Sequence, residues 1–463
     1  MGTCVSRGDL CIEQQSSNVE YDNCDESDVN INNFKLGCYL GIGGSGVVRS
    51  VVKLGGKNSG QAFALKSLSK SALLRKQSGP NSALNELKIL ITIAEHSSSN
   101  NFIANISYAF QDYSHVYIIL DHCSNGDLRF NLSRFGNFKE NIVQFFAAQI
   151  CLALNTIWSL NILHRDIKPE NLLICSNGYL KLTDFGVSKM LINVDRCYST
   201  SGTHGYMAPE VYLASHGVFH GRTADLFSLG VMLYELLLGK RPFAIDHFKG
   251  IKSLGAAPCF DLTPLWRLKN VSIHCKQFIN QLLMIHPTHR PFNFSREIRS
   301  HSWFLSENFD WSAISCGTLV SPIATTTSNN ASKLDVGSRN VQMALMKHKK
   351  QSEQIFNDEE QLKFENFKYP VVPSSLTLDC TTWGKDTNTN ASILSPLPIS
   401  PHSHSRIIAN TNVNMDSVAR TRIKMLYNGA RHNNTKHSNG NGNSNSHSHS
   451  NNSSISSSNS KIR

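Results

Sequence analysis

The chain has 463 residues, 40% of them hydrophobic, and a formal net charge of +11 at pH 7. This length can hold one large domain or two or three ordinary ones. The charge suits nucleic acid, an anionic membrane surface or simply solvated basic faces, but no arginine-rich run with interleaved aromatic residues favours a nucleic-acid groove. We therefore expect no nucleic-acid partner.

The 12 cysteines include no C-x-x-C pair and no Cys/His spacing typical of a zinc site. The sequence also shows no secretory signal and no apolar run long enough to span a membrane. We predict an intracellular protein with reduced thiols.

Composition divides the chain into four segments. Residues 1–33 are polar and predict an irregular arm, whereas residues 34–305 are rich in Leu, Ile, Phe and Val and predict one folded domain. Order is expected to fade through a tail at 306–370, and residues 371–463 are rich in Ser, Asn and His. Such a composition predicts disorder, because it buries too little apolar surface to offset chain entropy; its histidines can bind metal ions adventitiously.

The folded segment begins with strands and continues with helices. We predict a strand from Phe34 into a glycine cluster, a strand at 61–68, a helix at 82–95 and strands near 103–111 and 116–121. After Gly126 the pattern predicts helices, among them a buried one at 141–160 and another at 224–238. Strands first and helices afterwards predict an α+β fold of two lobes with a cleft between them.

The glycine cluster fits the pattern G-x-G-x-x-G-x-V. Glycines let backbone amides approach phosphate groups closely. A dinucleotide-binding turn or a plain glycine-rich hairpin can produce this pattern, but a dinucleotide site requires a helix directly afterwards, whereas valines and a strand follow here. We predict a hairpin over the phosphates of ATP, with contacts from Gly41, Ile42, Gly43, Gly44, Ser45, Gly46 and Val48.

Lys66 follows Ala64 on the next predicted strand, among apolar residues. A lysine there is either an edge-strand charge, which is the commoner case, or a phosphate ligand. Glu86 on the following helix can be an exposed helix charge, but its carboxylate can also hold Lys66 against the α- and β-phosphates. The pairing favours the phosphate ligand.

The segment from His164 to Asn171 fits H-R-D-x-x-x-x-N and is the most specific motif in the chain. Asp166 can accept the proton of an incoming hydroxyl, and Lys168 can neutralise charge on a phosphoryl group in flight. Asn171 can ligate Mg2+. This segment predicts phosphoryl transfer to a hydroxyl group.

Asp184-Phe185-Gly186 can be an ordinary turn, but after the previous motif it predicts a second Mg2+ ligand that bridges the β- and γ-phosphates. The stretch between it and Ala208-Pro209-Glu210 is rich in hydroxyl groups. A regulatory phosphate in this stretch can pair with Arg165. The candidate acceptors are Ser199, Thr200, Ser201 and Thr203.

Together these motifs resemble the eukaryotic protein kinase family over residues 34–305. The resemblance implies a bilobal fold, with a small β-rich lobe that carries one main helix and a larger helical lobe, and the use of ATP and Mg2+. It makes Leu120 the gatekeeper, places Asp121 and Cys123 in the adenine-binding hinge, and assigns Asp127 to the ribose. Leu173 joins them in the nucleotide site.

The same resemblance gives roles to residues of the larger lobe. It implies that Arg290 is the buried partner of Glu210 and that Asp225 is a signature residue. Lys168 and Gly202-Thr203 resemble the pattern of Ser/Thr-specific kinases, in which Thr203 hydrogen-bonds toward the catalytic aspartate.

The first six residues match M-G-x-x-x-[ST], the N-myristoylation signal at Gly2. A single myristoyl chain binds membranes only marginally, and Cys4 can supply a second, palmitoyl chain. The alternative is an ordinary initiator region with a chance glycine. We predict a protein tethered to the cytoplasmic face of a membrane.

Gly126-Asp127-Leu128-Arg129 and His301-Ser302-Trp303-Phe304 resemble the AGC group of kinases, and the acylated start resembles its YANK branch. YANK kinases often carry Asn where this chain has Gly186. The segment from Asn308 to Trp311 and Pro322 resemble the start of an AGC tail.

The segment from Phe364 to Tyr369 resembles the hydrophobic motif of that tail and is expected to fold onto the small lobe near Glu86, with Lys368 at the usual phosphosite. By the same resemblance Glu170, Asp127 and Glu235 select basic residues upstream of the target hydroxyl, although all three can instead be structural.

The sequence therefore predicts a monomeric, membrane-associated kinase that transfers the γ-phosphate of ATP to Ser or Thr of protein substrates. A pseudokinase scaffold would lack Lys66, Asp166 or Asp184, and none of these is lost. A third interpretation is an interaction platform in which the Asn/Ser-rich tail is the working part.

Overall fold

The computed structural model describes residues 29–43, 46–76, 78–96, 101–191, 196–305, 309–323, 342–343, 345–346 and 356–369. The myristoylation candidates Gly2 and Cys4, the loop residues Gly44 and Ser45, Asn308 and the Ser/Asn/His-rich tail lie outside these ranges.

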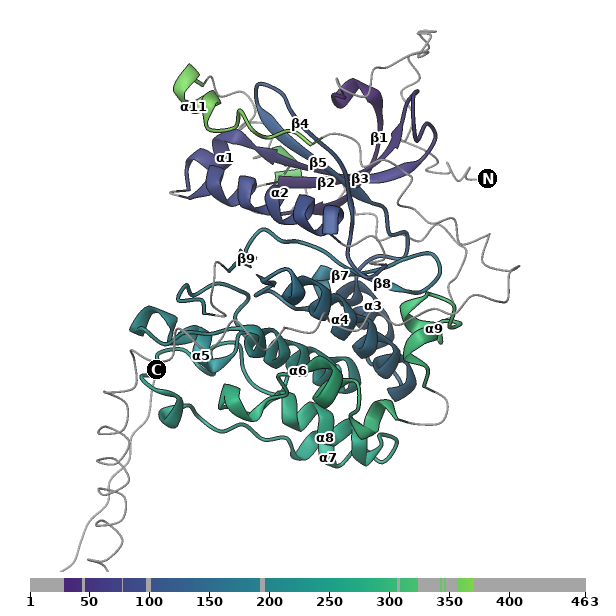
Figure 1. The fold of residues 1–463 in the computed structure, drawn as a ribbon, viewed down its shortest axis with the longest axis vertical. Helices are drawn as coiled ribbons and strands as arrows, with labels where there is room; N and C mark the ends of the chain where they lie inside the picture. Colours follow the sequence, from purple (N-terminus) through teal and green to yellow (C-terminus); the bar gives the residue numbers. More distant parts are fainter. Residues whose placement is uncertain are drawn as a thin grey trace, which may run out of the picture. The chain divides into compact units, whose positions relative to one another are not determined.

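A five-stranded antiparallel sheet forms the small lobe, with the strand order β1-β2-β3-β5-β4 (Figure 1). Its strands are β1 (Phe34–Ile42), β2 (Gly46–Lys53), β3 (Ala62–Ser69), β4 (Ile106–Gln111) and β5 (His115–Asp121). Two helices follow β3, namely α1 (Lys70–Leu74) and α2 (Gly79–His96). The sheet is apolar on both faces: Phe34, Phe63 and Tyr108 pack in one cluster, whereas Leu87 and Leu90 of α2 belong to the main core.

The larger lobe is built from helices. They are α3 (Leu128–Phe135), α4 (Glu140–Ser159), α5 (Pro209–Tyr212), α6 (Arg222–Leu238), α7 (Thr263–Trp266), α8 (Ile273–Leu282) and α9 (Trp311–Ser315). Two small antiparallel sheets pair β6 (Ile162–Leu163) with β9 (Lys189–Met190), and β7 (Leu172–Ile174) with β8 (Leu180–Leu182). This arrangement is the bilobal α+β fold that the strand-then-helix pattern predicts.

Two long helices make the centre of the larger lobe. α4 is long and apolar enough to cross a membrane, but 67% of its most apolar window is buried in the protein. α6 packs against both α4 and α8, and all its residues from Ala224 to Leu237 are buried. Both helices therefore belong to the core of the larger lobe.

Two predicted elements begin three residues away from the observed ones. The strand expected at 103–111 begins only at Ile106, because the backbone of Phe102 and Ala104 pairs instead with Leu182 of β8. The helix expected at 82–95 begins at Gly79, since Pro80 in the first turn needs no amide partner there.

The tail returns to the small lobe at residues 356–369, which include α11 (Asp358–Leu362). Phe364 and Phe367 are fully buried, and Tyr369 forms a β-bridge with Ala109 of β4. Lys70 of α1 donates to Gln361 at 2.7 Å. The hydrophobic-motif segment thus folds onto the small lobe, with Lys368 exposed to solvent.

Candidate active site

The glycine cluster lies at the turn between β1 and β2. The two strands pair antiparallel, with Gly41 opposite Val48 and Ile42 opposite Val47, so the segment is a hairpin and not the strand–turn–helix of a dinucleotide site. A Cβ at Gly46 would lie 2.5 Å from the carbonyl oxygen of Ser67, so the β2–β3 contact requires glycine there. A Cβ built at Gly41 or at Gly43 would have its nearest neighbouring atom at 3.8 Å, so neither position is crowded.

Lys66 lies on β3, between β2 and β5 in the sheet, which excludes the edge-strand interpretation. Its Nζ is 2.6 Å from Glu86 Oε1 and 3.0 Å from Asp184 Oδ1. Three predicted site residues from β3, α2 and the segment after β8 therefore meet at one ammonium group. This ion pair also connects the two lobes, because Asp184 belongs to the larger one.

These three groups change one another's pKa. Burial lowers the pKa of Lys66, but the charges of Glu86 and Asp184 outweigh it and raise the pKa above its ordinary value. Burial raises the pKa of Glu86, against the opposing charge of Lys66. The charge of Lys66 lowers the pKa of Asp184 to about 2, so Asp184 is a carboxylate at neutral pH.

Asp166 is 7% exposed and has partners on both carboxylate oxygens. Lys168 Nζ donates to Oδ2 at 2.7 Å, and the Asn171 amide donates to the same oxygen at 3.1 Å. Thr203 Oγ1 donates to Oδ1 at 2.6 Å and accepts from Lys168 at 2.8 Å. The structure thus joins the two predicted catalytic residues, one predicted metal ligand and the predicted regulatory threonine.

Two non-glycine residues of the site have left-handed backbone, Arg165 with φ 67° and Asp184 with φ 67°. Such conformations are unfavourable and persist where the surroundings hold them. The Asp225 carboxylate on α6 accepts the backbone amides of His164 and Arg165, at 3.2 and 2.8 Å. The ring of Phe185 stacks edge-on against His164 at 5.1 Å, which holds the segment after Asp184.

Asn171 and Asp184 suit a magnesium ion, which prefers oxygen ligands. The Asn171 amide nitrogen donates to Asp166, so the amide oxygen is the atom that would ligate the metal. Asp184 is ionised, and its side chain is 47% exposed. No group of three or more His, Cys, Asp or Glu side chains with metal-binding geometry occurs among the described residues.

The predicted nucleotide residues lie around the connection between the lobes. Leu120 of β5 is opposite Ala64 of β3, and Asp127 forms a β-bridge with Leu173 of β7. The Asp127 side chain caps α3 by accepting a 2.7 Å hydrogen bond from the Phe130 amide. This capping role is additional to the predicted contact with the ribose.

Two hinge residues have side-chain partners that the sequence does not suggest. Asp121 forms an ion pair with Lys181 of β8. The Cys123 thiol lies 3.2 Å from the thiol of Cys175, which directly follows β7.

The segment after Asp184 contains the predicted regulatory hydroxyl groups. Ser199 Oγ accepts a 2.6 Å hydrogen bond from Arg165 Nη1, and Thr200 is exposed. Cys197, which sequence reasoning missed, is 2% exposed and its sulfur lies 3.5 Å from the same Arg165 nitrogen. Burial raises its pKa, but the neighbouring His220 and Ser199 side chains lower the pKa to about 6.

Two of the three acidic positions expected to bind basic substrate residues, Glu170 and Glu235, are paired with an arginine of this chain. Arg129 of α3 bonds to Glu170 at 2.9 Å and to both oxygens of Glu235 at 3.0 and 3.1 Å. Sequence reasoning used Arg129 only as part of a family resemblance. An arginine two residues after a helix-capping aspartate was the available signal.

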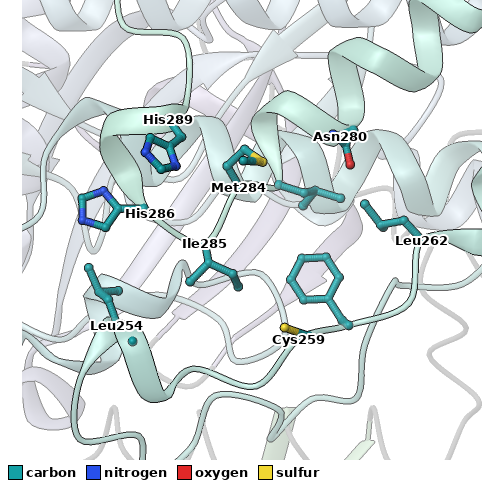
Figure 2. Close-up of a pocket in the computed structure, with 11 residues that line it drawn as sticks. Leu254, Cys259, Leu262, Asn280, Met284, Ile285, His286 and His289 are labelled. Carbon is teal, nitrogen blue, oxygen red and sulfur yellow. The ribbon is translucent and has the colours of Figure 1, made fainter. Parts of the chain in front are cut away.

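A cavity of about 430 Å³ lies elsewhere in the larger lobe, between the segment before α7 and the end of α8 (Figure 2). None of the residues predicted for phosphoryl transfer lines it. The lining includes Leu254, Phe260, Leu262, Leu283, Ile285 and His286.

Comparison with known proteins agrees with this geometry. Residues 34–304 match the family described as "Protein kinase domain". Ribosomal protein S6 kinase alpha-4 of Mus musculus is 32% identical over 318 residues, which cover 67% of this chain and 40% of that protein. Protein kinase 2 of Dictyostelium discoideum is 36% identical over 283 residues, covering 60% of this chain and 54% of that protein.

Serine/threonine-protein kinase 32C of Mus musculus is 32% identical over 271 residues, covering 58% of this chain and 53% of that protein. The chain thus spans roughly half or less of these relatives' lengths. The matched family covers more than half of this chain and contains the whole Lys66–Glu86–Asp184 and Asp166–Lys168–Thr203 constellation. The chain belongs to the protein kinase family.

Proposed function

We propose that this chain is a serine/threonine protein kinase that transfers the γ-phosphoryl group of ATP to protein hydroxyl groups. The observation that carries the proposal is Asp166, whose carboxylate is held by Lys168, Asn171 and Thr203. A carboxylate oxygen has two acceptor positions, so Oδ1 keeps one for a substrate hydroxyl beside Thr203.

Each of these side chains has a separate role in an in-line transfer of the phosphoryl group. The β1–β2 hairpin covers the phosphates and Lys66, fixed by Glu86, orients them. Asp166 orients the Ser or Thr hydroxyl and accepts its proton as the new O–P bond forms and the bond to the β-phosphate oxygen breaks. Lys168 stabilises the charge on the phosphoryl group in transit. ADP and a phosphorylated protein are the products.

Asn171 and Asp184 are the residues that would hold magnesium. A bound Mg2+ supplies neutralisation of the β- and γ-phosphate charges. The low pKa of Asp184 keeps that carboxylate available at any physiological pH.

The Ser/Thr preference is supported by Thr203, whose hydroxyl bonds both Lys168 and Asp166. A pseudokinase scaffold is the competing proposal. The intact Lys66–Glu86 pair and the ordered Asp166 carboxylate favour the enzyme.

We further propose that acylation at Gly2, with Cys4 as a second lipid site, places the chain on the cytoplasmic face of a membrane as a monomer, and that it belongs to the YANK branch of the AGC group. The support is the sequence match at the first six residues, the Gly126–Arg129 segment and the hydrophobic-motif segment packed on the small lobe.

The test of phosphoryl transfer compares the purified full chain with Asp166→Asn. With ATP, Mg2+ and a Ser/Thr peptide library, the variant should lose activity roughly 10²- to 10⁴-fold while its ATP affinity stays similar. Asp358→Asn, an exposed aspartate of α11, is the matched control and should keep full activity. Equal rates for Asp166→Asn and wild type would refute the proposal.

Membrane association is tested separately by fractionating cells that express wild type or Gly2→Ala. The variant should move to the soluble fraction and fail to incorporate a myristate analogue. Identical fractionation of the two proteins would rule out the acylation proposal.

A further inference from the structure

Arg129 occupies the acidic site that lies next to the catalytic loop. Its Nε lies 2.9 Å from Glu170 Oε1, and its two terminal nitrogens lie 3.0 and 3.1 Å from the two oxygens of Glu235. The Tyr206 hydroxyl donates to Glu235 and contacts the same guanidinium group. One internal arginine thus bridges both carboxylates.

Glu235 is largely closed to an incoming cation. Both of its oxygens are engaged by the planar guanidinium, and its side chain is only 6% exposed. Such a two-bond arginine–carboxylate pair is among the strongest charged contacts. Because Arg129 is tethered to the same chain, its effective concentration exceeds that of any arginine on a dissolved substrate.

The neighbouring carboxylates do not replace Glu235. Glu170 is exposed, but one of its oxygens already contacts Arg129. Asp127 uses Oδ1 to cap α3. The acidic cluster therefore holds its arginine already, before any substrate binds.

The cluster is connected to the reacting position from two sides. Glu170 precedes Asn171, whose amide bonds Asp166, and Tyr206 follows closely after Thr203, whose hydroxyl also bonds Asp166. An extended peptide advances roughly 3.3 Å per residue, so a substrate with its hydroxyl at Asp166 passes the cluster within a few residues.

We propose that Arg129 is a specificity-determining residue: it fills the Glu170–Glu235 site from inside the chain, so the kinase does not select substrates with basic residues near the acceptor. The inference rests on the proposed Ser/Thr phosphotransfer. It replaces the expectation that Glu170, Asp127 and Glu235 select basic substrates. Removing Arg129 opens the site to a substrate arginine.

A positional-scanning peptide library tests this with the purified full chain, ATP and Mg2+. Wild type should favour Arg or Lys by no more than about twofold at any position within five residues of the acceptor, whereas Arg129→Met should gain roughly tenfold selection at one or more positions. Arg134→Met, which removes an exposed arginine from the same helix, should keep the wild-type profile. Strong arginine selection by wild type, or an unchanged profile in Arg129→Met, would overturn the inference.

A second variant covers the risk that Arg129→Met does not fold once Glu235 is buried without its cation. Arg129→Met/Glu235→Gln removes both charges and leaves Glu170 free, so a smaller gain, about threefold, is expected at one position. No gain in the double variant would count against the proposal. Total phosphate incorporation is measured in the same assay. If wild type incorporates no phosphate, the proposed phosphotransfer is contradicted. If incorporation is normal but wild type selects Arg or Lys strongly, only the role of Arg129 is contradicted.

Discussion

Asp225 accepts a 2.8 Å hydrogen bond from the backbone amide of Arg165. The same carboxylate accepts the amide of His164 and the indole N–H of Trp158. Asp225 is 1% exposed and is the residue that holds the left-handed backbone just before Asp166. The position of the catalytic carboxylate therefore depends on a helix in the core of the larger lobe.

Asp225→Ala should impair both stability and turnover. It leaves three buried donors without their acceptor, and each unsatisfied group costs about 1–3 kcal/mol. We expect the free energy of unfolding to fall by a few kcal/mol and kcat to fall more than the affinity for ATP, because only the catalytic loop loses its support. Urea unfolding and steady-state kinetics measure the two effects, with the exposed Asp261→Ala as control. A variant with wild-type kcat would contradict this role.

Glu210→Gln should destabilise the larger lobe. Glu210 and Arg290 form a two-bond ion pair at 2.5 and 2.9 Å, and both side chains are fully buried. Removing one partner of such a pair costs about 3–5 kcal/mol, because the other charge remains buried without compensation.

The double variant Glu210→Gln/Arg290→Met removes both charges and should recover part of that loss. Chemical denaturation of the wild type, the two single variants and the double variant gives the coupling energy. Additive losses would show that the pair contributes no coupling.

Phe367→Ala should release the tail from the small lobe. Phe367 is fully buried, and truncating a buried phenylalanine costs about 3–5 kcal/mol. The expected signature is faster amide hydrogen exchange in residues 356–369 and at the β4 edge that Tyr369 pairs with. Lys368→Ala, next to it but exposed, should change stability by less than about 0.5 kcal/mol. Equal exchange in the two variants would argue against a docked tail.

Cys197 should titrate as an unusually acidic thiol. The neighbouring His220 and Ser199 side chains outweigh burial and bring its pKa to about 6, below the ordinary thiol value. The thiolate therefore contributes stability that is fully present above the ordinary pKa and is lost as pH falls through about 6.

The difference in thiolate absorbance between wild type and Cys197→Ser measures this directly and needs no access to the buried sulfur. We expect a midpoint near 6, and a midpoint near the ordinary thiol pKa would contradict the prediction.

The sequence by itself determined the local chemistry of this protein. The spacing of Asp166, Lys168 and Asn171, the glycine cluster before a valine-rich strand, and the alternating and helical patterns were sufficient to predict two lobes and a phosphate-transfer site. These features are local, because a catalytic loop or a hairpin needs particular residues within a few positions of one another.

Only the tertiary structure decided which distant groups meet. It brought Asp184 to the Lys66–Glu86 pair that the sequence suggested, set Cys197 between Arg165 and His220, and put Arg129 between Glu170 and Glu235. Those contacts join elements separated by long stretches of chain, and an isolated charge in a sequence gives no sign of which opposite charge it will meet. For the acidic cluster this is the basis of the proposed role of Arg129, because two of the carboxylates that suggest a basic substrate already bind an arginine of the protein itself.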